Sequence, residues 1–224
     1  MAISQWPKSE RPRERLISRG AGSLTDAELV AIFLRSGVRG QSALDLARTL
    51  LTAFGSLVGL LHGNLDQYLA HPGVGREKFA LFQAVRELSQ RYMLETIAKK
   101  DVLSSSAATR EYLRARFRCQ KSEVFSCLFL DNQHHIVKIE EMFSGTIDGA
   151  AVYPREVVRR CLEHNAAAVI FAHNHPSGIA EPSQADIAIT RRLKAALDTI
   201  DVRVLDHFVV GDPDVVSFAE RGLI

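Results

Sequence analysis

Apolar and polar residues follow two different patterns along the chain, and the change between them comes near residue 101. Residues 24–97 have helical periodicity, in short stretches that glycines and polar residues separate. Residues 102–224 instead alternate continuous apolar runs, which are typical of buried strands, with stretches of helical periodicity. The pattern therefore predicts two domains, a small all-helical domain at residues 1–100 and an α/β (α+β) domain at residues 102–224.

The second domain is predicted to be a mixed sheet with helices on its faces. Its strands are expected at residues 124–130, 136–143, 166–172 and 202–210, with a short element at 215–218. Helices are expected to begin close to Thr109, Pro154 and Ser183. A polar turn joins the first two strands, which predicts a hairpin.

The first domain is predicted to consist of helices with short connections. These helices are expected close to residues 24–34, 44–51, 65–69 and 78–98. Residues 1–20 are polar and rich in proline and arginine, so we expect much of this arm to be loosely ordered. Residues 99–108 interrupt the periodicity and are predicted to form the linker between the domains.

Candidate metal ligands lie where the third strand of the second domain ends. His173 and His175 are two residues apart after an apolar run, so their side chains are expected on the same face. Residues 176–178 turn the chain, and Ser183 begins a helix whose first turn contains Asp186. Two imidazoles and one carboxylate suit a zinc ion that keeps its fourth position open for water, as in catalytic sites.

A simpler interpretation is a capping box, in which Ser183 and Asp186 bond to N–H groups at the helix start. A lone His-x-His at a strand end is also more often a pair of polar residues at the edge of the fold than a metal site. Both patterns together, at this distance, are expected by chance in roughly one chain in a thousand. Ser183 can cap the helix while Asp186 binds metal, so the two interpretations are compatible, and we favour zinc.

The spacing His-x-His, seven residues, Ser, two residues, Asp is similar at every position to the motif of JAMM (MPN-domain) metalloproteases. Other segments resemble the bacterial RadC family more specifically. They are Phe-Ser-Gly-Thr at 143–146, Pro-Arg-Glu at 154–156, Ala-His-Asn-His-Pro-Ser-Gly at 172–178, Asp-His at 206–207 and Ser-Phe-Ala-Glu-Arg-Gly at 217–222. The resemblance covers nearly the whole chain. One departure is Tyr153, where family members often carry histidine.

The resemblance implies a JAMM/MPN fold with one zinc ion per chain, bound by His173, His175 and Asp186. It also implies hydrolysis of a peptide or isopeptide bond, so that the partner is a protein or peptide substrate. Asp206 and His207 on the late strand are expected to support the site by contacts to the metal ligands rather than to the ion.

A hydrolytic zinc site also needs a group that takes a proton from the attacking water. Glu123 corresponds to the glutamate that JAMM proteins place just before their first long strand, and we predict it to be this base. Glu140 and Glu141 are the alternatives. Ser183 is predicted to hydrogen-bond the developing oxyanion in addition to capping its helix.

A glycine-rich turn at residues 71–78 resembles the helix-hairpin-helix motif of DNA-repair and DNA-processing proteins. Gly73 and Gly75 permit a tight hairpin, and N–H groups at the start of the next helix can hold a phosphate. Arg76 and Lys78 would add positive charge. The alternative is a plain glycine turn between two helices. Contact with DNA would be independent of sequence and sensitive to salt.

Two other functions stay open beside hydrolysis. One is a metal-dependent nuclease, which a helix-hairpin-helix would suit. Two-metal phosphoryl chemistry prefers several clustered carboxylates, however, and the motif supplies one. The other is a non-catalytic DNA-binding or scaffold protein that retains zinc for stability.

Composition indicates an ordinary soluble globular protein, with a formal net charge of +2 over 224 residues. The charge is uneven, because residues 1–100 carry 14 Lys and Arg against 9 Asp and Glu, and residues 101–224 carry 14 against 17. The three cysteines, Cys119, Cys127 and Cys161, are widely spaced and suit a reducing compartment. The sequence has no 18-residue apolar stretch and no signal-peptide pattern, so the cytoplasm is the expected location and no membrane contact is predicted.

Overall fold

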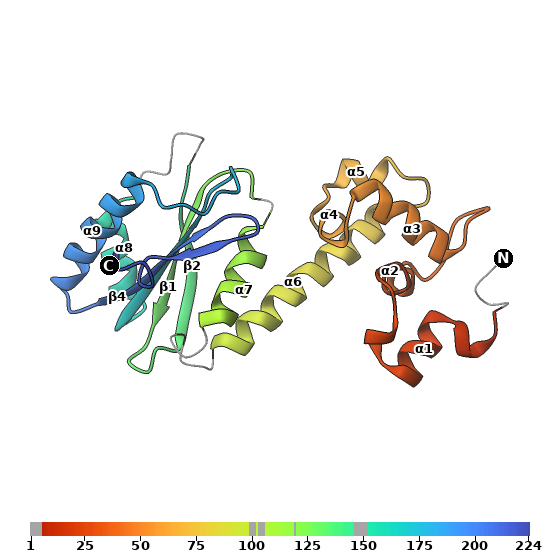
Figure 1. Ribbon diagram of the computed structural model, residues 1–224, viewed down its shortest axis with the longest axis horizontal. Coiled ribbons are helices and arrows are strands. Elements are labelled where there is room, and N and C mark those ends of the chain that lie inside the picture. Colours follow the sequence, from red (N-terminus) through yellow and green to blue (C-terminus); the bar gives the residue numbers. More distant parts are fainter. Residues whose placement is uncertain (1–5, 99–101, 103–105, 119, 146–151) are drawn as a thin grey trace. The chain divides into compact units, whose positions relative to one another are not determined.

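The computed structural model describes residues 6–98, 102, 106–118, 120–145 and 152–224. The chain divides into two compact units, and the division lies between Ser89 and Gln90 (Figure 1). The long helix α6 (Arg76–Ala98) crosses this division, because its last turns bury Ile97 in the core of the second unit. The units therefore divide earlier than the boundary predicted near residue 101. None of the helices in the described part of the chain has the length and apolar character that a membrane span requires.

The first unit is all-helical, as predicted. Its helical elements before α6 are η2 (Lys8–Glu10), α1 (Pro12–Arg19), η3 (Ala21–Ser23), α2 (Asp26–Leu34), α3 (Ala43–Phe54), α4 (Leu57–His62) and α5 (Leu65–Leu69). Thr25 and Ser42 begin α2 and α3 with capping boxes that satisfy N–H groups at the helix starts. The core gathers around Tyr68, whose hydroxyl donates to the Leu60 carbonyl at 2.6 Å.

The expectation that residues 1–20 are loosely ordered is wrong for the described residues of this arm. They form η2 and α1, and Pro12 is the first residue of α1, where proline favours a helix start. Arg15 pairs with the buried Glu28 at 2.5 Å and donates to the Ser23 carbonyl at 2.5 Å. Charged contacts thus help to attach this helix, and they are not visible in a pattern of apolar residues.

Within the described residues, five strands form one mixed sheet in the order β2-β1-β3-β4-β5. They are β1 (Val124–Leu130), β2 (Ile136–Ser144), β3 (Ala168–Asn174), β4 (Arg203–Val210) and β5 (Val215–Ser217). Strands β3 and β4 are parallel, and the other neighbouring pairs are antiparallel. The predicted mixed sheet and its opening hairpin are confirmed.

Helices cover both faces of the sheet (Figure 1). Helix α7 (Ser106–Phe117) and the end of α6 pack on one face, and α8 (Pro154–Glu163) and α9 (Gln184–Asp198) pack on the other. Strands β1 and β3 are buried along their whole length, because Leu128 packs with α7 while its neighbour Cys127 packs with α8. Burial on both faces explains why these strands are continuous apolar runs in the sequence.

Part of the predicted linker at residues 99–108 belongs to the core of the second unit. Val102 is buried, and its N–H donates to the His134 carbonyl at 3.2 Å. Helix α7 begins at Ser106, before the start expected near Thr109. Residues 99–101 and 103–105 of the predicted linker, together with Cys119 and Thr146, lie outside the described residues.

Candidate metal centre

Strand β3 carries the first predicted ligand into the middle of the sheet. His173 lies opposite Phe125 of β1 and Val209 of β4, and it is 1% exposed. After the strand ends, the N–H of His175 donates to the Val210 carbonyl at 2.9 Å. This bond keeps His175 in line with the strand, so that both imidazoles lie on the same side, as the spacing predicts.

Asp186 reaches the same point from the first turn of α9. Ser183 is the N-cap of this helix, and its hydroxyl accepts a hydrogen bond from the Asp186 N–H at 3.1 Å. In return, Oδ2 of Asp186 accepts bonds from the N–H and the hydroxyl of Ser183, both at 2.7 Å. The predicted capping box is therefore present, and it fixes the carboxylate while leaving Oδ1 available to a ligand.

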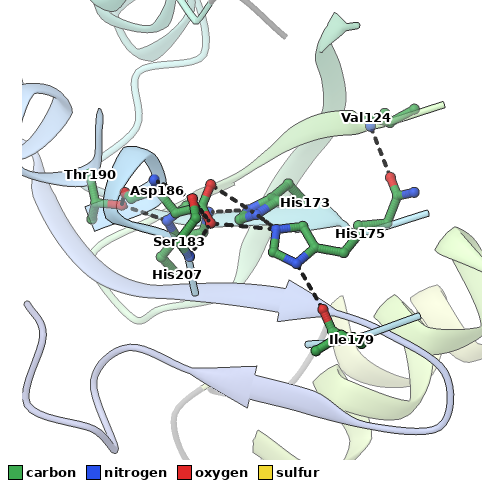
Figure 2. A network of polar contacts seen from close by, with 9 residues as sticks. Val124, His173, His175, Ile179, Ser183, Asp186, Thr190 and His207 are labelled. Carbon is green, nitrogen blue, oxygen red and sulfur yellow. Dashed lines mark hydrogen bonds and ion pairs between the residues drawn. The ribbon is translucent and has the colours of Figure 1, made fainter. Parts of the chain in front are cut away.

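The three side chains meet at their tips (Figure 2). The Nε2 atoms of His173 and His175 are 3.0 Å apart, and they lie 3.3 and 3.4 Å from the carboxylate oxygens of Asp186. One ligand atom from each residue falls within 4.8 Å of the others. Two imidazole nitrogens and one carboxylate oxygen around one point are a donor set that zinc accepts while keeping a position open. The residues therefore fit the predicted ion.

The charges of these side chains depend on one another. Hydrogen bonding to Asp186 raises the pKa of His175 although burial opposes it, and the charge of Glu123 adds to the rise. Burial alone would raise the pKa of Asp186, but hydrogen bonds from the two histidines and from Ser183 outweigh it and hold this pKa far below its ordinary value. The ionised carboxylate of Asp186 thus favours a cation beside the two imidazoles.

A buried histidine of β4, His207, contacts both His173 and the helix α9 (Figure 2). Nε2 of His207 lies 2.8 Å from Nδ1 of His173, and Nδ1 of His207 lies 2.6 Å from the hydroxyl oxygen of Thr190 on α9. Burial lowers the pKa of His207 well below its ordinary value, and the charge of His173 adds to the shift, so the His207 ring is neutral. The support predicted from His207 is confirmed as a direct contact.

Asp206 supports the site through the main chain, because its carboxylate accepts a hydrogen bond from the His207 N–H at 2.7 Å. Its carboxylate accepts bonds from the Ser217 hydroxyl at 2.6 Å and from the Ala219 N–H at 3.0 Å. Burial raises the pKa of Asp206. Adjacent residues of a strand point to opposite faces, so Asp206 joins β4 to the end of the chain while His207 faces the metal ligands.

Glu123, the predicted base, lies directly before β1 and is half-buried. The Asn174 side chain fixes the backbone on both sides of it. Oδ1 accepts from the Val124 N–H at 2.8 Å (Figure 2), and Nδ2 donates to the Ser122 carbonyl at 3.0 Å. The Glu123 carbonyl accepts from the Gly145 N–H at 2.9 Å. The sequence pattern did not single out Asn174, although a polar residue between two ligands at the end of an apolar run was a usable signal.

The alternative bases on β2 are engaged in other ion pairs. Glu140 pairs with Arg160 of α8 at 2.6 Å. Glu141 pairs with Arg116 of α7 at 2.9 Å. The geometry therefore favours Glu123 among the three glutamates, and its catalytic role stays a prediction.

Ser183 already uses its hydroxyl hydrogen in the bond to Asp186. A developing oxyanion would have to compete with this carboxylate for the same hydrogen. The oxyanion role of Ser183 therefore stays a prediction, while its capping role is observed.

Tyr153, the expected departure from the RadC pattern, is the N-cap residue of α8. Its ring centroid lies 6.1 Å from that of Phe143, and the Arg155 guanidinium lies 5.7 Å from the ring. The side chain is 52% exposed and lies against the start of α8 and the end of β2.

The glycine-rich turn at residues 71–78 belongs to the first unit. Gly73 must be glycine, because its φ is +75° and an added Cβ would lie 1.8 Å from the nearest side-chain atom. Gly75 has no positive φ and open space around it, so the conformation of the turn depends on glycine at residue 73 and not at residue 75. Arg76 is exposed where α6 begins, and Lys78 donates to the Gly73 carbonyl at 2.5 Å. Contact with DNA stays a prediction.

Comparison with known proteins agrees with this fold and this site. Residues 103–223 match the family model of the RadC-like JAB domain, and residues 3–80 match the model of the UPF0758 N-terminal domain. A UPF0758 protein of Nitrosococcus oceani is 58% identical over 224 residues, which is 100% of both chains. UPF0758 proteins of Stutzerimonas stutzeri and Aliivibrio salmonicida are 59% identical over 222 residues (99% of both chains) and 55% identical over 224 residues (100% of both). The resemblance to RadC is thus confirmed, and the chain belongs to the family of UPF0758 proteins with a RadC-like JAB domain.

Proposed function

We propose that this protein is a zinc-dependent hydrolase that cleaves a peptide or isopeptide bond. The observation that carries the proposal is the convergence of His173, His175 and Asp186 from a strand, the turn after it and a helix start. Membership of a family with a RadC-like JAB domain supports it. A bound zinc ion would supply a Lewis acid that polarises a carbonyl group and makes water more acidic.

Glu123 is proposed to accept the proton of the attacking water and to pass it to the leaving amine. This role requires a carboxylate that is close to the ligands without being one of them. The charge of Glu123 acts on His175, and the amide of Asn174 holds the backbone on either side of Glu123. Two neutral imidazoles and one carboxylate leave a zinc site with a net positive charge, and a second bound carboxylate would cancel it.

The donor set favours hydrolysis over the two alternative functions. A nuclease with two metal ions prefers several clustered carboxylates, whereas the cluster found in the described part of the chain contains a single one, Asp186. A scaffold protein that retains zinc for stability usually closes the ion with four protein ligands, whereas this cluster provides three.

Metal analysis and activity assays on the full chain test the proposal together. The wild type should bind about one zinc ion, and His175→Ala should lose it, because two remaining ligands rarely hold zinc against buffer. His135→Ala, on the turn between β1 and β2, is the matched control and should keep zinc. The zinc-loaded protein is then assayed against peptide, isopeptide-linked and DNA substrates. Absence of zinc from the wild type, or full zinc in His175→Ala, would end the proposal, and cleavage of DNA alone would replace it with the nuclease.

We infer a second role for the first unit, sequence-independent binding of DNA at residues 71–78. Two observations support it, the exposed Arg76 at the start of α6 and the open space beside the Gly75 backbone. Affinity for DNA should fall steeply with salt and hardly vary with sequence. Arg76→Ala should weaken DNA binding. Arg19→Ala, at an exposed position of α1, should leave it unchanged. Equal binding by Arg76→Ala and the wild type would refute the assignment.

A further inference from the structure

A histidine binds a metal ion only through a ring nitrogen that carries no proton, so the tautomer of each ligand decides whether the site works. For His175 the tautomer follows from a single contact. Its Nδ1 lies 2.8 Å from the Ile179 carbonyl oxygen, which accepts hydrogen bonds and cannot donate one (Figure 2). Nδ1 therefore carries the proton, and Nε2 is left for the metal.

For His173 the corresponding partner is ambiguous, because it is another histidine. Nδ1 of His173 lies 2.8 Å from Nε2 of His207, and either nitrogen could be the donor. Nδ1 of His207 in turn lies 2.6 Å from the hydroxyl oxygen of Thr190. The same hydroxyl oxygen lies 2.6 Å from the main-chain carbonyl oxygen of Asp186.

The carbonyl oxygen at the end of this series gives it a direction. Thr190 has one hydroxyl hydrogen, and at 2.6 Å from the Asp186 carbonyl this hydrogen must lie between the two oxygens. The hydroxyl oxygen can then only accept from Nδ1–H of His207, which leaves Nε2 of His207 as an acceptor for Nδ1–H of His173. The reverse direction would bring two oxygens together without a hydrogen and would place a proton on Nε2 of His173.

We propose that Thr190 and His207 form a directed hydrogen-bond chain, ending at the Asp186 carbonyl, that fixes His173 in the tautomer with Nε2 free for the metal ion. The proposal rests on the metal site of the proposed function. Asp186 then acts twice, since its carboxylate is a ligand and its carbonyl orients a second ligand. Thr190 and His207 are positioning residues, because they act on the ion only through His173.

Burial makes this chain rigid and leaves no substitute for its members. His173 and Thr190 are each 1% exposed and His207 is 0% exposed, so water does not replace a missing partner. The His207 ring is also held by its neighbours, with ring centroids 5.5 Å from Phe125 and 4.7 Å from Phe218. A ring packed in this way cannot turn to offer its other nitrogen.

Nitrogen NMR of the metal-free wild type tests the chain without any substitution. The imidazole signals distinguish a ring nitrogen that carries a proton from one that does not. We expect a proton on Nδ1 of His207 and on Nδ1 of His173. A proton on Nε2 of His207, or on Nε2 of His173 in place of its Nδ1, would overturn the proposal.

Zinc affinity, measured by competition with a chelator, gives the second test. Thr190→Val removes the hydroxyl and should weaken zinc binding by about 10–100-fold, the usual effect of losing an outer partner of a ligand. Thr190→Ser keeps the hydroxyl and should bind as the wild type does. Thr199→Val is the matched control, because the exposed Thr199 makes a similar 2.6 Å bond to a carbonyl of the same helix without touching a histidine. Zinc binding by Thr190→Val that equals the wild type would refute the role of the hydroxyl.

His207→Gln provides a rescue within the same assay. The side-chain oxygen of glutamine can take the place of Nε2 as the acceptor for His173, so zinc affinity should stay closer to the wild type than in His207→Leu. Equal affinities of the two variants would contradict the chain. If the wild type binds no zinc at all, the proposed function fails, while the NMR result still decides the tautomer of His173 independently.

Discussion

Asn174→Ala separates the support of the metal centre from the ligands themselves. Asn174 is 3% exposed and lies between His173 and His175 in the sequence. Its amide makes two bonds, from the Val124 N–H at 2.8 Å and to the Ser122 carbonyl at 3.0 Å. The substitution deletes both bonds and leaves all three ligands unchanged, so it should affect the position of the backbone around residue 123 and the stability of the second unit.

The magnitude follows from the burial of the two groups that lose a partner. Val124 is 4% exposed, and an N–H left unpaired there costs about 1–3 kcal/mol. The half-buried Ser122 carbonyl reaches water, so the loss of its bond costs about 0.5–1.5 kcal/mol. The free energy of unfolding should fall by about 1.5–4.5 kcal/mol in total. The melting temperature of the second unit should then fall by about 2–4 °C for each kcal/mol.

Calorimetry measures this change, and the chain contains its own reference. Trp6 is the only tryptophan and packs in the first unit, so its fluorescence follows a transition that the substitution should leave unchanged. Asn132→Ala, in the exposed turn between β1 and β2, is the control substitution. Zinc should stay bound, and hydrolysis should fall by about 10²-fold, because a shift of about 1 Å in Glu123 misplaces the base.

Two results would refute this reasoning. A change in the free energy of unfolding below about 0.5 kcal/mol, which is typical of an ordinary surface substitution, would mean that the Asn174 amide does not support the backbone. Loss of zinc in Asn174→Ala would mean that the amide positions the ligands themselves rather than Glu123.

Glu123→Gln should retain zinc and lower the rate of hydrolysis by about two to four powers of ten, measured by metal analysis and turnover on the same sample. Gly73→Ala should lower the melting temperature of the first unit, followed by tryptophan fluorescence, because of its φ of +75°, whereas Gly75→Ala should not. Cys127 and Cys161 should resist thiol reagents until the protein unfolds, because burial raises the pKa of Cys127 well above its ordinary value and that of Cys161 to about 12.

The opposite outcomes are equally specific. Loss of zinc in Glu123→Gln would make Glu123 a ligand, and unchanged turnover would move the base to Glu140 or Glu141. Equal melting of Gly73→Ala and the wild type would mean that the turn adapts to a side chain. Rapid labelling of either cysteine in the folded protein would show that the second unit opens at the contact between β1 and α8.

The cluster of His173, His175 and Asp186 could be predicted from the sequence because local patterns specify these positions. His173 and His175 obey the two-residue period of a strand, and Asp186 obeys the spacing of a helix start. Strands β1 and β3 could be predicted for the same reason, since burial on both faces leaves a continuous apolar run. None of these inferences needs knowledge of which elements become neighbours.

The supporting residues could not be predicted, because their roles depend on strand pairing and helix packing. Thr190 contacts His207 only where α9 packs beside β4, and Asn174 contacts Ser122 and Val124 only because β1 pairs with β3. The different roles of Asp206 and His207 could not be predicted for a related reason, since the sequence does not tell which face of β4 is turned toward the candidate ligands. Contacts between residues that are far apart in the sequence leave no periodic pattern of apolar and polar positions.

Main-chain groups set the position of every metal ligand. His175 is held by the Ile179 carbonyl, Asp186 by the Ser183 N–H, and the contacts behind His173 end at the Asp186 carbonyl. The sheet and the start of α9 define where these groups lie, so the fold itself brings the three side chains together. Hydrogen bonding to Asp186 raises the pKa of His175. A metal ion bound there would meet side chains that main-chain groups already hold, which is the preorganisation that electrostatic catalysis requires.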